Sequence, residues 1–276
     1  MKRIITIQDI SCVGKCSLTV ALPIISAAGV EAAVLPTAVL STHTQFERFT
    51  FCDLTDEIQP ISDTLDYLGI DFDAIYTGYL GSHRQLGLVS DFIDRFGASA
   101  TVVIDPVMAD NGVLYKGFTP EFASAMAKLC GKADLIIPNL TEASFMLDVP
   151  YNPDYDEDYI RELLKKLATL GAPEVALTGI SFEPDKIGVY SYNAKTDTYF
   201  YYCNKKLPLT YHGTGDVYAS AVLGALMRGF STTESLAIAV DYTLMCMEKT
   251  AADPNHRFYG VNFEEALPYY ISRLNK

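Results

Sequence analysis

Short apolar runs alternate along the chain with longer stretches in which apolar residues recur every three or four positions. The apolar runs predict strands at 3–8, 32–40, 73–79, 101–106, 133–139 and 174–179. The helical periodicity predicts helices at 17–29, 63–70, 84–97, 119–130 and 158–171. Strands that alternate with helices form βαβ units, and continuously apolar strands are typical of burial on both faces. The pattern therefore predicts an α/β fold with a mostly parallel central sheet covered by helices on both faces.

The alternation stops in the last third of the chain. Two β-rich runs flank "NAKTD" within 186–204, which predicts an antiparallel hairpin at an edge of the sheet. Helical patterns follow at 215–228, 233–250 and 263–274. Because no linker, repeat or low-complexity tract interrupts the chain, we expect residues 1–276 to form a single domain.

Composition and charge narrow the classes of partner. The 276 residues are 49% hydrophobic and carry a formal net charge of -13, which argues against a nucleic-acid partner, since that needs a basic face. The N-terminal segment lacks the apolar region of a secretory signal, and no apolar run reaches the roughly 20 residues of a membrane span. Six scattered cysteines without the spacing of a zinc site indicate reduced thiols and a cytoplasmic protein.

Polar residues gather where the predicted strands end. Asp9 follows the first strand, and each later strand is followed by its own polar loop. These loops are "STHTQF" (41–46), "TGYLGS" (77–82), "DPVMADNG" (105–112), "PNLTEA" (138–143) and "LTGIS" (177–181). Because ligands bind at the carboxyl ends of the strands in open α/β sheets, we expect these loops to meet in one site.

The stretch "HGTGDVYAS" (212–220) places a glycine-rich turn and an acid at the start of a predicted helix. Free backbone N–H groups at a helix N-terminus bind anionic oxygens, and glycine lets a phosphate approach the backbone closely. A carboxylate at Asp216 could accept the proton of an attacking hydroxyl during phosphoryl transfer. The motif alone leaves an alternative open, in which Asp216 is only the N-cap of the helix.

Two other phosphate-binding motifs match the sequence poorly. The stretch "VGKCS" (13–17) is similar to a P-loop, but Asp9 stands in place of the first glycine and Cys16 in place of the hydroxyl that binds magnesium. No G-x-G-x-x-G follows the first strand, so a Rossmann dehydrogenase has little support.

Taken together in their order and spacing, these motifs resemble the pyridoxal (vitamin B6) kinases of the ribokinase superfamily. The "GTGD" and "DPVM" elements mark the superfamily, and "HTQ" and "GYLGS" indicate a pyridoxal kinase within it. The resemblance runs nearly end to end. It implies a ribokinase-like fold, transfer of the γ-phosphoryl group of MgATP to the 5′-hydroxymethyl group of a B6 vitamer, and a homodimer.

The resemblance also implies roles for particular residues. Asp216 matches the general base, and Gly213, Thr214 and Gly215 match the anion hole. The acids that hold Mg²⁺ and its waters are matched by Asp105, Asp110 and Glu142, and the nucleotide contacts by Asn139, Thr178 and Thr214. A few carboxylates, completed by phosphate and water, are what Mg²⁺ prefers. A monovalent cation such as K⁺ is left open, and Asp105 as a turn residue and Asn139 as a helix cap remain as alternatives.

The vitamin site is implied by a further group of matching positions. These are Asp9, Leu40, His43, Thr44, Tyr79 and Tyr115. Thr44 can hydrogen-bond a ring substituent, Leu40 and Tyr79 supply apolar and flat walls, and Tyr115 matches a mobile loop that covers the substrates. For His43, a buried structural role is the alternative.

The chain departs from the usual pattern at two positions. Asp9 stands where the better-known pyridoxal kinases have a neutral serine, which leaves the order of preference among the vitamers open. The "ADNG" stretch replaces a commoner glycine, which leaves the metal contact of Asp110 open. A hydroxymethylpyrimidine kinase, a sugar kinase and a non-catalytic B6-binding protein remain as alternatives, although the chain lacks the "GSDPSGGAG"-like loop and the cysteine after "GTG" of the first of these.

Overall fold

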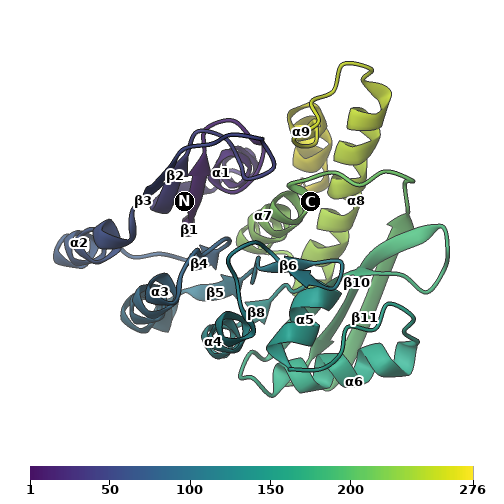
Figure 1. Ribbon diagram of the computed structural model, residues 1–276, viewed down its shortest axis with the longest axis horizontal. Coiled ribbons are helices and arrows are strands. Elements are labelled where there is room, and N and C mark those ends of the chain that lie inside the picture. Colours follow the sequence, from purple (N-terminus) through teal and green to yellow (C-terminus); the bar gives the residue numbers. More distant parts are fainter. Residues whose placement is uncertain (276) are drawn as a thin grey trace.

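The computed structural model describes residues 1–275 and has at its centre a nine-stranded sheet (Figure 1). The strand order is β11-β10-β9-β8-β5-β4-β1-β2-β3, and the six strands from β9 to β2 are parallel. The parallel strands are β1 (Arg3–Ser11), β2 (Glu31–Leu40), β4 (Ala74–Thr77), β5 (Thr101–Ile104), β8 (Leu135–Ile136) and β9 (Glu174–Ile180). The antiparallel strands at the two edges are β3 (Phe51–Asp53), β10 (Lys186–Asn193) and β11 (Thr198–Lys205).

Helices cover both faces of the sheet (Figure 1). One face packs against α2 (Thr55–Tyr67), α3 (His83–Phe96), α4 (Pro120–Cys130), α5 (Leu140–Met146) and α6 (Glu157–Ala168). The other packs against α1 (Leu18–Ala27), α7 (Thr214–Met227), α8 (Thr232–Ala252) and α9 (Phe263–Arg273). Successive strand residues alternate between the two cores, so that Ile4 packs with the second group and Ile5 with the first. Residues 217–225 of α7 are buried throughout, because this helix lies between the sheet and its neighbouring helices.

The structure confirms the predicted α/β class, the parallel sheet and the edge hairpin. It also corrects several boundaries. The first strand continues to Ser11, so Asp9 lies inside β1 and does not follow it. The helix predicted at 63–70 begins earlier, at Thr55. Residues 138–143, predicted as a polar loop, contain the start of α5.

Several short elements were not predicted from the sequence. The edge strand β3 has three exposed residues and no apolar run. The strands β6 (Ala109–Asp110) and β7 (Val113–Leu114) form a separate two-stranded hairpin within the "DPVMADNG" region. The structure contains, within residues 1–275, no helix with the length and apolar character needed to cross a bilayer.

Candidate active site

The first turn of α7 carries the glycine-rich motif. Gly213 is the N-cap residue, with left-handed φ and ψ of 75° and 3°, and no side chain caps the helix there. The backbone amides of the first turn therefore have no side-chain cap, and their role as an anion hole stays a prediction. Asp216 is the third residue of the helix, so it is not the N-cap, and the capping alternative for this residue does not hold.

Asp216 accepts a hydrogen bond from the backbone N–H of Ser17, the N-cap of α1. Burial raises the pKa of its carboxyl group from the ordinary value of 3.8 to about 6, the Ser17 hydrogen bond lowers it, and the nearby charge of Asp9 raises it further. A carboxylate with such a pKa is mostly ionised at neutral pH and is a stronger proton acceptor than an exposed aspartate. The first turn of α7 thus carries a carboxyl group of raised pKa beside amides without a side-chain cap.

Two buried acids from different loops lie close together, and one of them, Asp105, is also close to Asp216. Asp105 follows β5, and Glu142 lies in the first turn of α5. Burial raises the pKa of Asp105 well above its usual range, and Glu142 and Asp216 raise it further. The charges that raise the pKa values of Asp105 and Asp216 are those of other carboxylates. A buried cluster of like charges is unfavourable unless a cation or a proton joins it.

Glu142 also has a structural part in this site. One carboxylate oxygen accepts from the Asn139 N–H at 2.8 Å and the other from the Met108 N–H at 3.0 Å. The first of these bonds belongs to a capping box at the start of α5. Burial raises the pKa of Glu142 to about 7 despite these bonds. Glu142 therefore holds the loop after Asp105 against α5.

Asp110, a predicted metal ligand, and Tyr115, a predicted substrate contact, belong to the segment that follows Asp105. Asp110 is exposed, and its carboxylate accepts from the backbone and side chain of Asn111. Tyr115 is 42% exposed, but partial burial and then the charges of Glu142, Asp110, Asp105 and Asp216 raise the pKa of its hydroxyl. Tyr115 thus lies beside the acids that the sequence assigned to the metal. Within the described residues, the side chains form no cluster of three or more His, Cys, Asp or Glu that could hold a metal ion by itself.

Asn139, which follows β8, and Thr178 of β9 lie side by side and are joined by an isolated parallel bridge. The Asn139 amide is engaged at both ends, since its oxygen accepts from the Glu142 N–H and its nitrogen donates to the Ala109 carbonyl oxygen. Asn139 is thus the N-cap of α5, as its structural alternative predicted. Its nucleotide contact and that of Thr178 stay predictions.

Asp9 is only 4% exposed and lies at an irregularity in the pairing of β1 with β2. One carboxylate oxygen accepts from the Ser11 hydroxyl at 3.0 Å, and Ser17 provides a second side-chain hydrogen bond. Burial raises the pKa of Asp9. The charge of Asp9 reaches the hydroxyl of Tyr79, so these two predicted vitamin contacts lie in one region. Leu40 is buried at the end of β2, whereas Thr44 is exposed in the loop that follows.

The loop after β2 is tied to the glycine-rich turn by contacts that the sequence did not predict. The side-chain amide of Gln45 contacts the ring of His212, with its nitrogen 2.9 Å from Nδ1. His43 Nδ1 accepts from the Gln45 N–H at 3.1 Å, and Nε2 lies 3.2 Å from the Tyr259 carbonyl oxygen. Both ring nitrogens of His43 are therefore engaged within the protein, which supports its structural alternative.

Lys15, the lysine of "VGKCS", is directed away from the anion site. Its ammonium group pairs with Glu264 at 2.9 Å and donates to the Val261 carbonyl oxygen at 3.1 Å. This agrees with the exclusion of a P-loop, in which the lysine must reach the phosphates.

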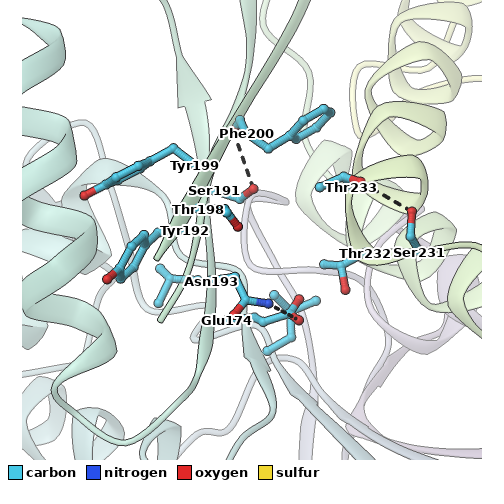
Figure 2. A pocket seen from close by; sticks show the side chains of 12 residues that line it. Glu174, Ser191, Tyr192, Asn193, Thr198, Tyr199, Phe200, Ser231, Thr232 and Thr233 are labelled. Atoms are coloured by element: carbon cyan, nitrogen blue, oxygen red, sulfur yellow. Dashed lines mark hydrogen bonds between the residues drawn. The ribbon is translucent and has the colours of Figure 1, made fainter. Parts of the chain in front are cut away.

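A cavity of about 330 Å³ lies elsewhere, between the hairpin and the start of α8 (Figure 2). It is lined by Glu174 and Leu135, the first residues of β9 and β8, so it opens at the amino ends of the parallel strands. Glu174 accepts from the Asn193 amide at 2.8 Å, and Ser231 contacts Thr233 (Figure 2). This cavity is at the opposite end of the strands from the predicted site residues, and we assign it no part in the chemistry.

The chain is similar to several proteins of known sequence and structure. The family described as phosphomethylpyrimidine kinase matches residues 22–262. The pyridoxine kinase of Bacillus subtilis (strain 168) is 30% identical over 213 residues, which span 75% of this chain and 73% of the relative.

Two solved structures share the whole fold. One comes from Bacteroides thetaiotaomicron VPI-5482, is described as a phosphomethylpyrimidine kinase and was crystallised with pyridoxal. It is 41% identical to this chain, with a TM-score of 0.92 over 98% of this chain and 95% of that chain. The pyridoxal kinase of Lactobacillus plantarum is 29% identical, with a TM-score of 0.92 over 99% and 97% of the two chains. The chain therefore belongs to the phosphomethylpyrimidine kinase family and is a ribokinase-like enzyme of the same group as its pyridoxal kinase relatives.

Proposed function

We propose that the protein transfers the γ-phosphoryl group of ATP to the 5′-hydroxymethyl group of pyridoxal, pyridoxine or pyridoxamine. The observation that carries this proposal is Asp216, a base with a pKa of about 6 beside the free amides that begin α7. In this role Asp216 accepts the proton of the hydroxymethyl group, and the amides of Gly213, Thr214 and Gly215 stabilise the phosphoryl oxygens. The likeness to a structure crystallised with pyridoxal supports the vitamin as acceptor.

The acidic cluster fits a magnesium ion. Asp105 and Glu142 are buried and are surrounded by other carboxylates, so a divalent cation would relieve their repulsion. Mg²⁺ usually takes one or two carboxylates together with phosphate oxygens and water. Bound here by Asp105, with Glu142 and Asp110 near it, the ion would neutralise charge on the transferred phosphate.

The match to the phosphomethylpyrimidine kinase family favours one second candidate, a hydroxymethylpyrimidine kinase. The missing "GSDPSGGAG"-like loop and the aspartate in place of a cysteine after "GTG" favour a B6 vitamer instead, and the buried Asp9 could pair with its protonated pyridine nitrogen or amine. The test is the rate of ADP formation by the purified protein with MgATP and each of four acceptors: pyridoxal, pyridoxine, pyridoxamine and hydroxymethylpyrimidine. A kcat/KM that is highest for hydroxymethylpyrimidine would reject the proposal in favour of the second candidate.

Glu142→Gln is expected to raise the Mg²⁺ concentration needed for half-maximal rate by about tenfold, as changes around a bound metal commonly do. The variant removes one charge from the cluster and places an amide N–H against one of two backbone N–H groups. A magnesium titration at saturating ATP measures the effect. Glu162→Gln, the same change at an exposed ion pair with Lys166, is the control and should leave the titration unchanged.

Asp9→Asn is expected to lower kcat/KM for pyridoxamine about fivefold more than kcat/KM for pyridoxine. At about 4 Å and an effective dielectric of about 20, the attraction of a carboxylate for the charged amine is about 4 kcal/mol before desolvation. Desolvation cancels much of it, and a remaining ~1 kcal/mol corresponds to about fivefold. The asparagine can still accept from Ser11. Equal losses for the two vitamers would mean that Asp9 faces away from the 4-substituent.

A further inference from the structure

Beneath the acids of the site, three polar side chains meet within the core, and we call them the polar floor: Gln8, Tyr76 and Ser220. Gln8 lies on β1 and Tyr76 on β4, two neighbouring parallel strands in which Thr6 pairs with Tyr76. Side chains two residues apart on a strand share a face, so Gln8 lies on the same face as Thr6 and therefore as Tyr76. Ser220 comes from α7, which covers this face.

The same geometry places the floor directly below the catalytic acids. Tyr76 pairs with Val103 of β5, and Asp105 is two residues further on the same face. Ser220 lies four residues after Asp216, one turn along the same side of α7. The charges of both Asp105 and Asp216 act on the Tyr76 hydroxyl. Tyr76 thus reaches toward both acids from below.

The floor is buried and unusually polar for a core. Gln8, Tyr76 and Ser220 are each 0% exposed. Gln8 Oε1, the Tyr76 hydroxyl and Ser220 Oγ make no hydrogen bond of good geometry within the described chain, although the Gln8 and Ser220 side chains lie beside Tyr76. The Gln8 side chain fits under the neighbouring loop because residue 78 is glycine, where a Cβ would lie 2.5 Å from Gln8 Oε1.

Buried polar side chains without hydrogen-bond partners lower the stability of the folded protein. Buried polar groups in native proteins are almost always paired, and each one that is unpaired calls for an explanation. A phenylalanine at position 76 and an alanine at position 220 would remove the cost without changing the packing much. For Tyr76 the neighbouring groups that distinguish it are the carboxylates of Asp105 and Asp216, whose charges act on its hydroxyl.

We propose that Tyr76 is a positioning residue for the phosphoryl transfer, which with Ser220 and Gln8 holds the side chains of Asp105 and Asp216 in the orientation that the reaction needs. The Tyr76 hydroxyl donates toward the carboxylates, and the Ser220 and Gln8 side chains orient that hydroxyl. Because Tyr76 is fully buried beneath the acids, we expect its effect to fall on kcat and not on binding. The inference rests on the proposed function of Asp216 as the base.

The test is Tyr76→Phe, compared with Tyr218→Phe in the intact protein. Tyr218 is the matched control because its hydroxyl is also buried and without a partner in residues 1–275, yet burial alone raises its pKa and no acid acts on it. We expect Tyr76→Phe to lower kcat about tenfold, with KM for ATP and for the acceptor changed less than twofold. Tyr218→Phe should leave kcat within twofold of the wild type. The melting temperatures of both variants should equal or exceed that of the wild type.

A double variant and a structure complete the test. If Tyr76 and Ser220 act together, Tyr76→Phe with Ser220→Ala should lose little more kcat than the worse single variant. Equal losses in Tyr76→Phe and Tyr218→Phe, or an unchanged kcat in Tyr76→Phe, would overturn the proposal. If the wild type phosphorylates none of the four acceptors, the proposed function fails first. In that case a crystal structure of Tyr76→Phe tests whether the polar floor orients the two acids. The proposal predicts that the Asp105 and Asp216 carboxylates rotate, and unchanged carboxylates would overturn it.

Discussion

Asp216→Asn is expected to lower kcat by about 10²- to 10⁴-fold, the usual effect of removing a general base. Asparagine keeps the size of the side chain and can still accept from the Ser17 N–H, but it cannot take the proton of the acceptor hydroxyl. The affinity for MgADP, measured by calorimetry, should change less than threefold, because the anion-binding amides of the first turn of α7 are retained. A kcat within tenfold of the wild type would remove Asp216 from the role of base.

The pH dependence follows from the same residue. The base acts in its ionised form, and its pKa is about 6, so kcat/KM of the wild type should fall about tenfold per pH unit below pH 6. Asp216→Asn should lose this dependence on whatever activity remains. Comparing pyridoxine with pyridoxamine separates the titration of Asp216 from that of the vitamers. If the fall in kcat/KM at low pH belongs to Asp216, it has its midpoint at the same pH for both vitamers.

The melting temperature of Asp216→Asn shows whether this variant is still folded. The folded-state pKa of Asp216 is raised above the unfolded value of 3.8, so the folded protein binds this proton more tightly. Its contribution to stability is therefore present below pH 4 and is lost as the pH rises through about 6. At pH 7 the neutral asparagine avoids this cost, and the melting temperature of Asp216→Asn should not fall below that of the wild type. If the variant were inactive because it is unfolded, its melting temperature would be lower than that of the wild type.

The fold was largely predictable from the sequence because its central strands are apolar on both faces. The runs at β1, β2, β4, β5 and β9 and the periodic helices around them produced the correct class and the correct edge hairpin. The failures have local causes. α2 begins eight residues before the predicted 63–70 helix, in a stretch that contains Asp56, Glu57 and Pro60 and buries few apolar side chains. The exposed strand β3 has no apolar pattern at all.

The site was predictable only where a motif is continuous in the sequence. "GTGD" predicted a helix start with an anion-binding turn, and the structure has the helix start at Gly213 with Asp216 in its first turn. The partners of the site residues come from other loops, and no periodicity reveals them. The Ser17 N–H on Asp216 depends on a backbone φ of 51° at Ser17, and the Gln45 contact to His212 joins residues 167 positions apart. Asp9 was placed after β1 because polar residues usually end an apolar strand, whereas here the strand carries them into the site.

Gly213→Ala is expected to be the most damaging of the glycine substitutions in the site. Gly213 has a φ of 75°, and a Cβ at this position would lie 2.2 Å from the carbonyl oxygen of Lys15, which is backbone and cannot simply rotate away. The left-handed conformation alone costs an alanine about 1–2 kcal/mol, and the contact forces the two loops apart. Because the 15–17 segment provides the Ser17 N–H that holds Asp216, the substitution also displaces the base.

We expect Gly213→Ala to lose about 2–4 kcal/mol of unfolding free energy and at least about 100-fold in kcat, since a shift of about 1 Å at a reacting group commonly costs that much. Denaturant unfolding and steady-state kinetics measure the two effects. Gly229→Ala separates strain from contact, because Gly229 has a φ of 85° and nothing lies within 4 Å of its added Cβ. That control should lose only about 1–2 kcal/mol and keep its kcat. If both variants lose the same stability and Gly213→Ala keeps its activity, the approach of the Lys15 carbonyl to Gly213 has no part in placing Asp216.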